Sequence, residues 1–265
     1  MGQQIRFFEK NKADFSSDTV VATASQGDTY ADRVLDRSNN TAWVTTGSVD
    51  ADNTTFELDF GDTKRIDSIL LLKHNFKSYE IQYWDGDSWE NFGTDIDETV
   101  YAAESSFHQF AALETTKVKL TIRGTQTAND EKKLYQFICT EEIGQLNSWP
   151  VIKKAQTSRN RVRTKMLSGK ENIREQVGAF STSLSVSILS DSDDLDVIEA
   201  LHDANEGFLV WLCGGSESQF SSVRKGYRLE DVFLMKCVGE LVNEFYKGIY
   251  PNGLVVKFDL VEVVD

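Results

Sequence analysis

The residues that could perform acid–base or nucleophilic chemistry are scattered along this sequence and form no familiar catalytic motif. The three histidines, His74, His108 and His202, show neither HxxxH nor HExxH spacing, and neither a GxSxG nor a GxxxxGK[ST] motif is present. Acidic pairs such as Asp85 and Asp87 lie in polar segments that are typical of solvated turns. We therefore expect a protein that is not an enzyme.

The cysteines also predict no reactive centre. Cys139, Cys213 and Cys237 lie far apart, without CxxC spacing. An odd number of isolated cysteines in apolar surroundings predicts buried free thiols in a reducing compartment, and not a metal or redox site.

Composition and charge exclude several classes of protein. Hydrophobic residues make up 40% of the 265 residues, which predicts a globular chain long enough for two domains. The net charge of -14 argues against nucleic-acid binding, which depends on basic residues that neutralise phosphates. No apolar run approaches the roughly 20 residues that span a bilayer, and the first residues lack the apolar core of a signal peptide. We expect synthesis and folding in a cytoplasm.

The first half of the chain reads as a series of short strands. Residues 55–60 alternate between polar and apolar types up to Gly61 and Asp62, and residues 66–72 form an apolar strand. Residues 79–83 then lead through Asp85 and Gly86 toward Trp89, and Asp-Gly between alternating hydrophobic residues is a strong hairpin signal. These elements predict a β-sandwich.

The order of several motifs resembles that of the discoidin family, the galactose-binding-like domains of coagulation-factor C type. The motifs are VLD at residues 34–36, NTAW at 40–43, ELDFG at 57–61, IDSI at 66–69, and YEIQY at 79–83 followed by Asp85, Gly86 and Trp89. The resemblance implies a jelly-roll β-sandwich over residues 1–147, and contact with carbohydrate.

The discoidin resemblance also implies a calcium site in the loop before Trp43. Asp36, Asn39 and Thr41 occupy matching positions, and Gln136 occupies the position where a late acidic ligand is expected. Oxygen ligands suit a hard cation, but Gln136 and the replacement of the usual Gly-Asp by Arg37-Ser38 leave fewer carboxylates and predict weaker affinity. The alternative is that these side chains hold the loop by hydrogen bonds.

A ligand site has two weak candidates. His74, Asn75 and Lys77 follow the strand of residues 69–72 and are expected at one end of the sandwich, where a solvated loop is the alternative. Trp43, like Trp84 and Trp89, could stack on a sugar, but packing in the core or at the rim is the competing interpretation.

The second half, residues 148–265, starts near Pro150 and is expected to be a second β-sandwich with one flanking helix and an extended arm. Residues 180–188 alternate strictly, and a helix is predicted from Asp193 with Leu195, Ile198 and Leu201 on one side. Strands are predicted at 208–212, 227–238 and 253–264. The expected fold class of the whole chain is all-β to α+β.

A basic segment opens this half. Residues 153–174 contain eight basic residues and one acid, and residues 159–161 are expected to form the tip of a hairpin. Solvated strand faces are the simple explanation. The functional alternative is a subunit interface in which Arg159, Arg161, Arg163 and Lys165 pair with the acidic first domain of a neighbouring copy.

The order of elements in this half resembles the domain of phage tail-tube and distal-tail baseplate proteins. The resemblance implies a structural protein of a phage or phage-like tail, made in the host cytoplasm and located in the virion tail. Its partners would be copies of itself in a ring, other tail or baseplate proteins, and a cell-surface glycan. The alternatives are a free carbohydrate-binding module protein and an accessory subunit of a carbohydrate-active enzyme.

Overall fold

The computed structural model divides the chain into two compact units. The N-terminal unit comprises Glu9–Glu142, and the C-terminal unit comprises Met1–Phe8 together with Ile143–Asp265. Within these units the structure describes residues 5–14, 19–37, 40–47, 49–148, 151–165, 171–189, 193–204, 207–211, 232–245 and 253–263. All structural statements below concern these residues.

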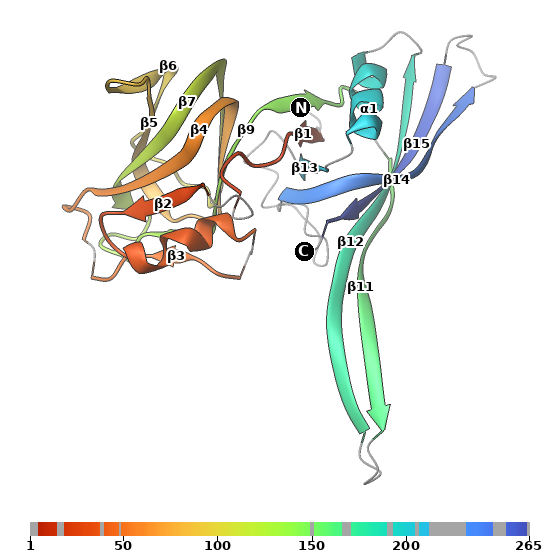
Figure 1. Ribbon diagram of the computed structural model, residues 1–265, viewed down its shortest axis with the longest axis horizontal. Coiled ribbons are helices and arrows are strands. Elements are labelled where there is room, and N and C mark those ends of the chain that lie inside the picture. The colour runs from red at the N-terminus through yellow and green to blue at the C-terminus, as the bar shows by residue number, and fades with distance from the viewer. Residues whose placement is uncertain are drawn as a thin grey trace. The chain divides into compact units, whose positions relative to one another are not determined.

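The N-terminal unit is a β-sandwich, which confirms the predicted fold class (Figure 1). Its main sheet has the strand order β2-β4-β7-β5-β6, with β9 also paired to β4, and β3 pairs with β8. The elements are β2 (Val21–Ala24), the 3-10 helix η1 (Asp28–Leu35), β3 (Trp43–Val44), β4 (Thr54–Leu72), β5 (Phe76–Trp84), β6 (Trp89–Glu98), β7 (Ser106–Thr125), β8 (Lys133–Leu134) and β9 (Gln136–Thr140).

Strand β4 is continuous where the sequence predicted two strands. Its register with β7 shifts between Asp59 and Lys64, so Gly61 lies in a bulge and does not end the strand. Gly61 has φ +75°, and a Cβ there would lie 2.9 Å from the carbonyl oxygen of Thr19. A glycine therefore suits this bend, which lets β4 pair with β2 along its first part and with β9 along its second.

The predicted hairpin is confirmed, and its second strand, β6, is an edge strand of the sheet. Strands β5 and β6 are antiparallel, with Trp84 opposite Trp89, and Gly86 in the turn has φ +110°. Alternation along β4 places Phe56, Leu58 and Phe60 in the core, where all three are fully buried.

The C-terminal unit is built on one antiparallel sheet of seven strands, in the order β10-β1-β13-β14-β15-β12-β11. The elements are β1 (Arg6–Phe8), β10 (Glu142–Gln145), β11 (Val151–Lys165), β12 (Glu171–Leu189), α1 (Asp193–Asp203), β13 (Phe208–Trp211), β14 (Val232–Phe245) and β15 (Gly253–Glu262). From β11 onward, the described elements follow the predicted order of strands and helix. Residues 227–231 of the predicted strand lie outside the described residues.

Helix α1 contributes to the core through Ile198 and Leu201, as its spacing predicts. Asp194, expected near the helix start, is buried and accepts hydrogen bonds from the backbone N–H groups of Asn147 and Ser148, both at 2.8 Å.

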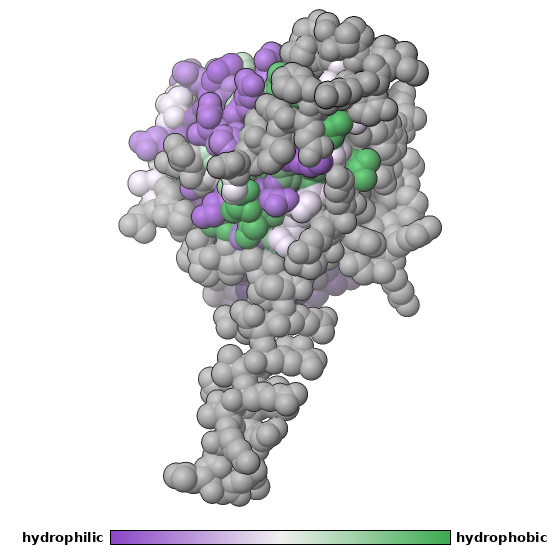
Figure 2. Space-filling view, turned by 90° about the vertical axis from the view of Figure 1, so that its right-hand side faces the viewer, coloured by the Kyte–Doolittle hydropathy of each residue, from purple (hydrophilic) through white to green (hydrophobic). Residues whose placement is uncertain are grey.

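On the face of the molecule drawn in Figure 2, hydrophilic residues form the largest coloured area and hydrophobic residues form smaller patches.

The boundary between the units differs from the predicted division at residues 147 and 148. Strand β1, which was expected to belong to the first domain, pairs with β13 and lies between β10 and β13. Ile5, Phe7 and Phe8 are at most 1% exposed. The N-terminal unit is therefore an insertion between two neighbouring strands of the C-terminal sheet. Trp149 and Pro150, where the division was expected, lie outside the described residues.

Strands β11 and β12 form the predicted arm, but its tip is not where the sequence suggested. Residues 159–161 pair with 175–177, and the ladder continues to Lys165 opposite Glu171. Strand β12 pairs with β15 only from Ser181 onward, so the outer part of β11 and β12 extends beyond the sheet as a two-stranded ribbon (Figure 1). No helix among the described residues is long and apolar enough to cross a membrane.

Candidate functional site

The loop expected to bind calcium contains a hydrogen bond between two of its candidate ligands. The hydroxyl of Thr41 donates to Oδ2 of Asp36 at 2.5 Å, and Arg37, at φ +56°, forms an ion pair with Asp14. Two oxygen-bearing side chains thus face each other, which fits a hard cation and equally fits a hydrogen-bonded loop. Calcium binding stays a prediction.

The other two expected calcium ligands add little to this loop. Asn39 lies outside the described residues, and Gln136 is a strand residue of β9, opposite Leu72 and 5% exposed. Among the described residues, no group of three or more histidine, cysteine, aspartate or glutamate side chains could hold a metal ion.

His74 is a core residue, which corrects its expected position in an exposed ligand loop. It is 2% exposed, its ring stacks on Phe76 at 4.8 Å, and its Nδ1 accepts a hydrogen bond from the backbone of Phe76. Burial, with a smaller effect of His108, lowers the pKa of His74 to about 3. His108 is hydrogen-bonded through Nε2 to the hydroxyl of Tyr79 at 2.9 Å, and burial lowers its pKa to about 4. Both rings are therefore neutral at pH 7.

Asn75 and Lys77 lie near His74 but differ from it in their surroundings. The Asn75 amide donates to the carbonyl oxygen of Glu131 at 2.7 Å and accepts from the backbone N–H of Lys133 at 2.9 Å. Asn75 therefore joins the β4–β5 loop to the segment before β8. Lys77 is exposed. The structure thus assigns a structural role to Asn75 and leaves Lys77 on the surface.

A second polar network at this end of the sandwich was not foreseen from the sequence. The carboxylate of Asp50 accepts hydrogen bonds from the backbone N–H and hydroxyl of Thr125 at 3.0 and 2.8 Å, and from the backbone N–H of Asn129 at 3.2 Å. Burial acts to raise the pKa of Asp50, but these hydrogen bonds outweigh it and lower the pKa. Because its partners lie about 75 residues away, no local pattern could reveal the network.

Lys132 is completely buried beside this network. Its ammonium group donates to the backbone carbonyl of Asp52 at 2.5 Å and to the hydroxyl of Thr54 at 3.0 Å. Burial lowers the pKa of Lys132, against the opposing effect of the Asp50 and Asp52 charges. These polar groups satisfy one another, which indicates that they hold the loops in place.

The three tryptophans of the N-terminal unit divide into one core residue and one surface pair. Trp43 is fully buried, and its indole N–H donates to the carbonyl oxygen of Gln26 at 3.1 Å, so the packing interpretation holds for it and stacking on a sugar is not available. Trp84 and Trp89 are half-buried at the β5–β6 hairpin, with ring centroids 5.3 Å apart at 68°. The ammonium group of Lys119 lies 4.3 Å from the centroid of the Trp89 ring.

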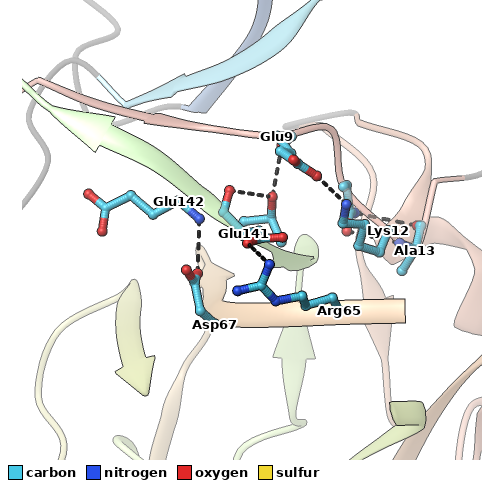
Figure 3. Close-up of polar contacts among 9 residues, drawn as sticks. Glu9, Lys12, Ala13, Arg65, Asp67, Glu141 and Glu142 are labelled. Atoms are coloured by element: carbon cyan, nitrogen blue, oxygen red, sulfur yellow. Dashed lines mark hydrogen bonds and ion pairs between the residues drawn. The ribbon is translucent and has the colours of Figure 1, made fainter. Parts of the chain in front are cut away.

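The two ends of the N-terminal unit are hydrogen-bonded to each other, and the second end is also bonded to β4 (Figure 3). The backbone N–H of Glu9 donates to the carbonyl oxygen of Glu141 at 2.9 Å, and Arg65 pairs with the Glu141 carboxylate at 3.1 Å. The backbone N–H of Glu142 donates to Asp67 at 2.9 Å. Adjacent ends are what an inserted domain requires, because the host sheet must continue at the point where the chain left it.

The remaining predicted residues are only partly described. The backbone of Arg159, Arg161, Arg163 and Lys165 lies in β11, but their side chains lie outside the described residues. Cys139 is a buried free thiol, as expected, and burial raises its pKa. Burial also raises the pKa of Cys237 to about 11, whereas Cys213 lies outside the described residues.

Comparison with known proteins identifies the family of the N-terminal unit. Residues 14–135 match the family described as F5/8 type C domain. The N-terminal unit therefore contains an F5/8 type C, discoidin-like domain, which confirms the resemblance found in the sequence. A comparison with curated proteins found no match.

Several solved structures are similar to part of the chain. Chitosan-binding module 1 derived from the chitosanase/glucanase of Paenibacillus sp. IK-5 shares 20% identity, and the match covers 49% of this chain and 98% of the module with a TM-score of 0.41. CpGH89CBM32-5 from Clostridium perfringens, in complex with GalNAc-beta-1,3-galactose, shares 19% identity over 46% of this chain and 94% of its own, with a TM-score of 0.39. A GH29 fucosidase from Ruminococcus gnavus in complex with fucose shares 14% identity over 50% of this chain and 27% of its own, with a TM-score of 0.42.

Proposed function

We propose that this protein displays a carbohydrate-binding domain on an assembly domain, as a structural component of a phage or phage-like tail. The N-terminal unit makes contact with a glycan on a cell surface. The C-terminal unit joins copies of the chain into a ring at the baseplate or tail tip. The observation that carries the first part is the match of residues 14–135 to the F5/8 type C domain.

The contacts of the titratable groups in the described part of the N-terminal unit support a binding role for it. Burial lowers the pKa of His74 and His108, so both rings are neutral at pH 7. His108 is hydrogen-bonded to Tyr79 of the core. The buried lysine of this unit, Lys132, and the carboxylate of Asp50 form hydrogen bonds with groups of the surrounding loops. Among the described residues, these contacts favour a stable scaffold over acid–base catalysis.

The arm and the edge of the C-terminal sheet support the assembly role. Strand β11 is 15 residues long, and among the described strands it pairs only with β12, so its other edge can accept a further strand. This strand carries Arg159, Arg161, Arg163 and Lys165, whereas residues 1–147 contain 25 acidic and 14 basic residues. Opposite charges on one chain favour association between copies.

Light scattering and negative-stain electron microscopy of the purified chain test the assembly. We expect closed rings whose mass is a multiple of 29.9 kDa. Replacement of Arg159, Arg161, Arg163 and Lys165 by glutamate is expected to give monomers. Glutamate at four exposed or partly exposed lysines of the N-terminal unit, Lys10, Lys64, Lys73 and Lys77, should leave the rings intact. A wild-type chain that stays monomeric at high concentration and binds glycans would support the alternative of a free carbohydrate-binding module protein.

A further inference from the structure

The strand register brings two polar amides beside the half-buried tryptophan pair, on the outer face of the N-terminal sheet. Gln82 of β5 lies opposite Asn91 of β6 on one side and opposite Lys119 of β7 on the other. Directly opposed residues in antiparallel strands point to the same face, and Trp84 points there too because it is two residues from Gln82. The face therefore presents Trp84, Trp89, Gln82 and Asn91 together.

The two amides leave complementary hydrogen-bonding groups unused. Nε2 of Gln82 donates to Oδ1 of Asn91 at 3.1 Å. Among the described residues, nothing else bonds to either side chain, so Oε1 of Gln82 can accept and Nδ2 of Asn91 can donate. A sugar hydroxyl both donates and accepts, so one hydroxyl or an adjacent pair can satisfy both amides.

The tryptophans add an apolar surface next to these amides. Large indole rings are usually highly buried, and here two of them are held at 68° to each other on the surface by the hairpin. The apolar face of a pyranose ring packs on such a surface, while its hydroxyl groups reach the polar neighbours.

The positive charges on this face have acidic partners, and Asp85, Asp87 and Glu90 add negative charge at the hairpin. Lys117 pairs with Asp59 at 2.7 Å, and Lys119 lies opposite Glu57. The surrounding surface therefore offers no excess of positive charge to an acidic sugar. We propose that Trp84, Trp89, Gln82 and Asn91 form a binding platform for a neutral glycan. This inference rests on the proposed function of the N-terminal unit and assigns the site to a sheet face instead of the loops at its end.

The test uses the full-length chain on an array of neutral oligosaccharides and their sialylated counterparts, followed by titration calorimetry with the neutral oligosaccharide that binds best. We expect Asn91→Ala to weaken binding roughly 3- to 10-fold, from the loss of one hydrogen bond. Trp89→Ala should weaken binding by at least about 10-fold. Tyr30→Ala, at an aromatic residue that is 48% exposed on η1, is the control and should bind like wild type.

The outcomes separate the platform from the proposed function. If wild type binds a neutral glycan and both platform variants bind equally well, the platform is overturned while carbohydrate binding stands. A clear preference for sialylated glycans also overturns the inference. If wild type binds none of the glycans, both the platform and the proposed function are overturned. Asn91 is exposed, so its variant is expected to fold and keeps the test decisive if Trp89→Ala does not.

Discussion

Removal of residues 1–8 is expected to unfold the C-terminal unit even though the deletion lies 134 residues before that unit continues at Ile143. Strand β1 lies inside the sheet, and Ile5, Phe7 and Phe8 are at most 1% exposed. Phe7 also packs edge to face on Phe208, with ring centroids 5.9 Å apart. Burial of one such side chain contributes about 1.5–3 kcal/mol, so three contribute roughly 5–9 kcal/mol. That amount is comparable to the total stability of about 5–15 kcal/mol of a typical domain.

The assay compares three proteins by circular dichroism during urea denaturation. These are the full-length chain, residues 9–142 and residues 143–265. We expect residues 9–142 to unfold cooperatively, because the ends of this unit are hydrogen-bonded to each other. Residues 143–265 should show no cooperative transition, since their sheet lacks a strand between β10 and β13.

A point mutation gives the same test within the intact chain. Phe7→Ala should destabilise the C-terminal unit by about 3–5 kcal/mol. The matched control is Phe56→Ala, because Phe56 is equally buried but belongs to the core of the N-terminal unit. Each variant should lower only the transition of its own unit. A stable, cooperatively folded fragment of residues 143–265 would refute the assignment of β1 to this sheet.

Three further predictions concern the N-terminal unit. Burial lowers the pKa of His74 and His108 to about 3 and about 4, so the unfolded state binds more protons than the folded state below pH 6.5. The free energy of unfolding should therefore fall by about 1.4 kcal/mol per histidine for each pH unit below 6.5. Equal urea midpoints at pH 7 and pH 5 would contradict this. Asp50→Ala should cost about 1–3 kcal/mol in urea denaturation by leaving donors unpaired, whereas Asp62→Ala on the exposed bulge should cost almost nothing. Calcium should raise the melting temperature of wild type but not of Asp36→Ala; no shift for wild type would contradict a calcium site at Asp36.

Local patterns predicted most of the elements because their signals lie within a few residues. The turn at Asp85 and Gly86 predicts a hairpin, and the alternation of residues 180–188 predicts a strand. Both the hairpin and the strand are present. Because glycine favours turns, the sequence predicts that a strand ends at Gly61. Long-range pairing with β7 on both sides of this residue instead makes β4 continuous. The strand residues 6–8 gave no signal that their partner would be β13, some 200 residues away.

The candidate site was harder to predict because burial depends on contacts between distant residues. His74 looks like a loop residue in sequence, yet Phe76, Tyr79 and Tyr101 surround its ring. For Trp43 the sequence left both sugar stacking and core packing open, and its contact with Phe56 places it in the core. The amide pair of Gln82 and Asn91 became visible only from the strand register, since nine residues and a hairpin separate the two.

We infer that the assembled protein presents many weak glycan sites at once. Surface plasmon resonance on an immobilised glycan is the most direct test of this multivalent binding. The chip carries the neutral glycan that binds best on the array. Assembled wild-type protein should dissociate slowly. The variant with glutamate at Arg159, Arg161, Arg163 and Lys165 should bind the same glycan but dissociate about 100-fold faster or more, because it binds through one site. Equal dissociation rates for the two proteins, or no binding by the wild-type protein, would contradict the account.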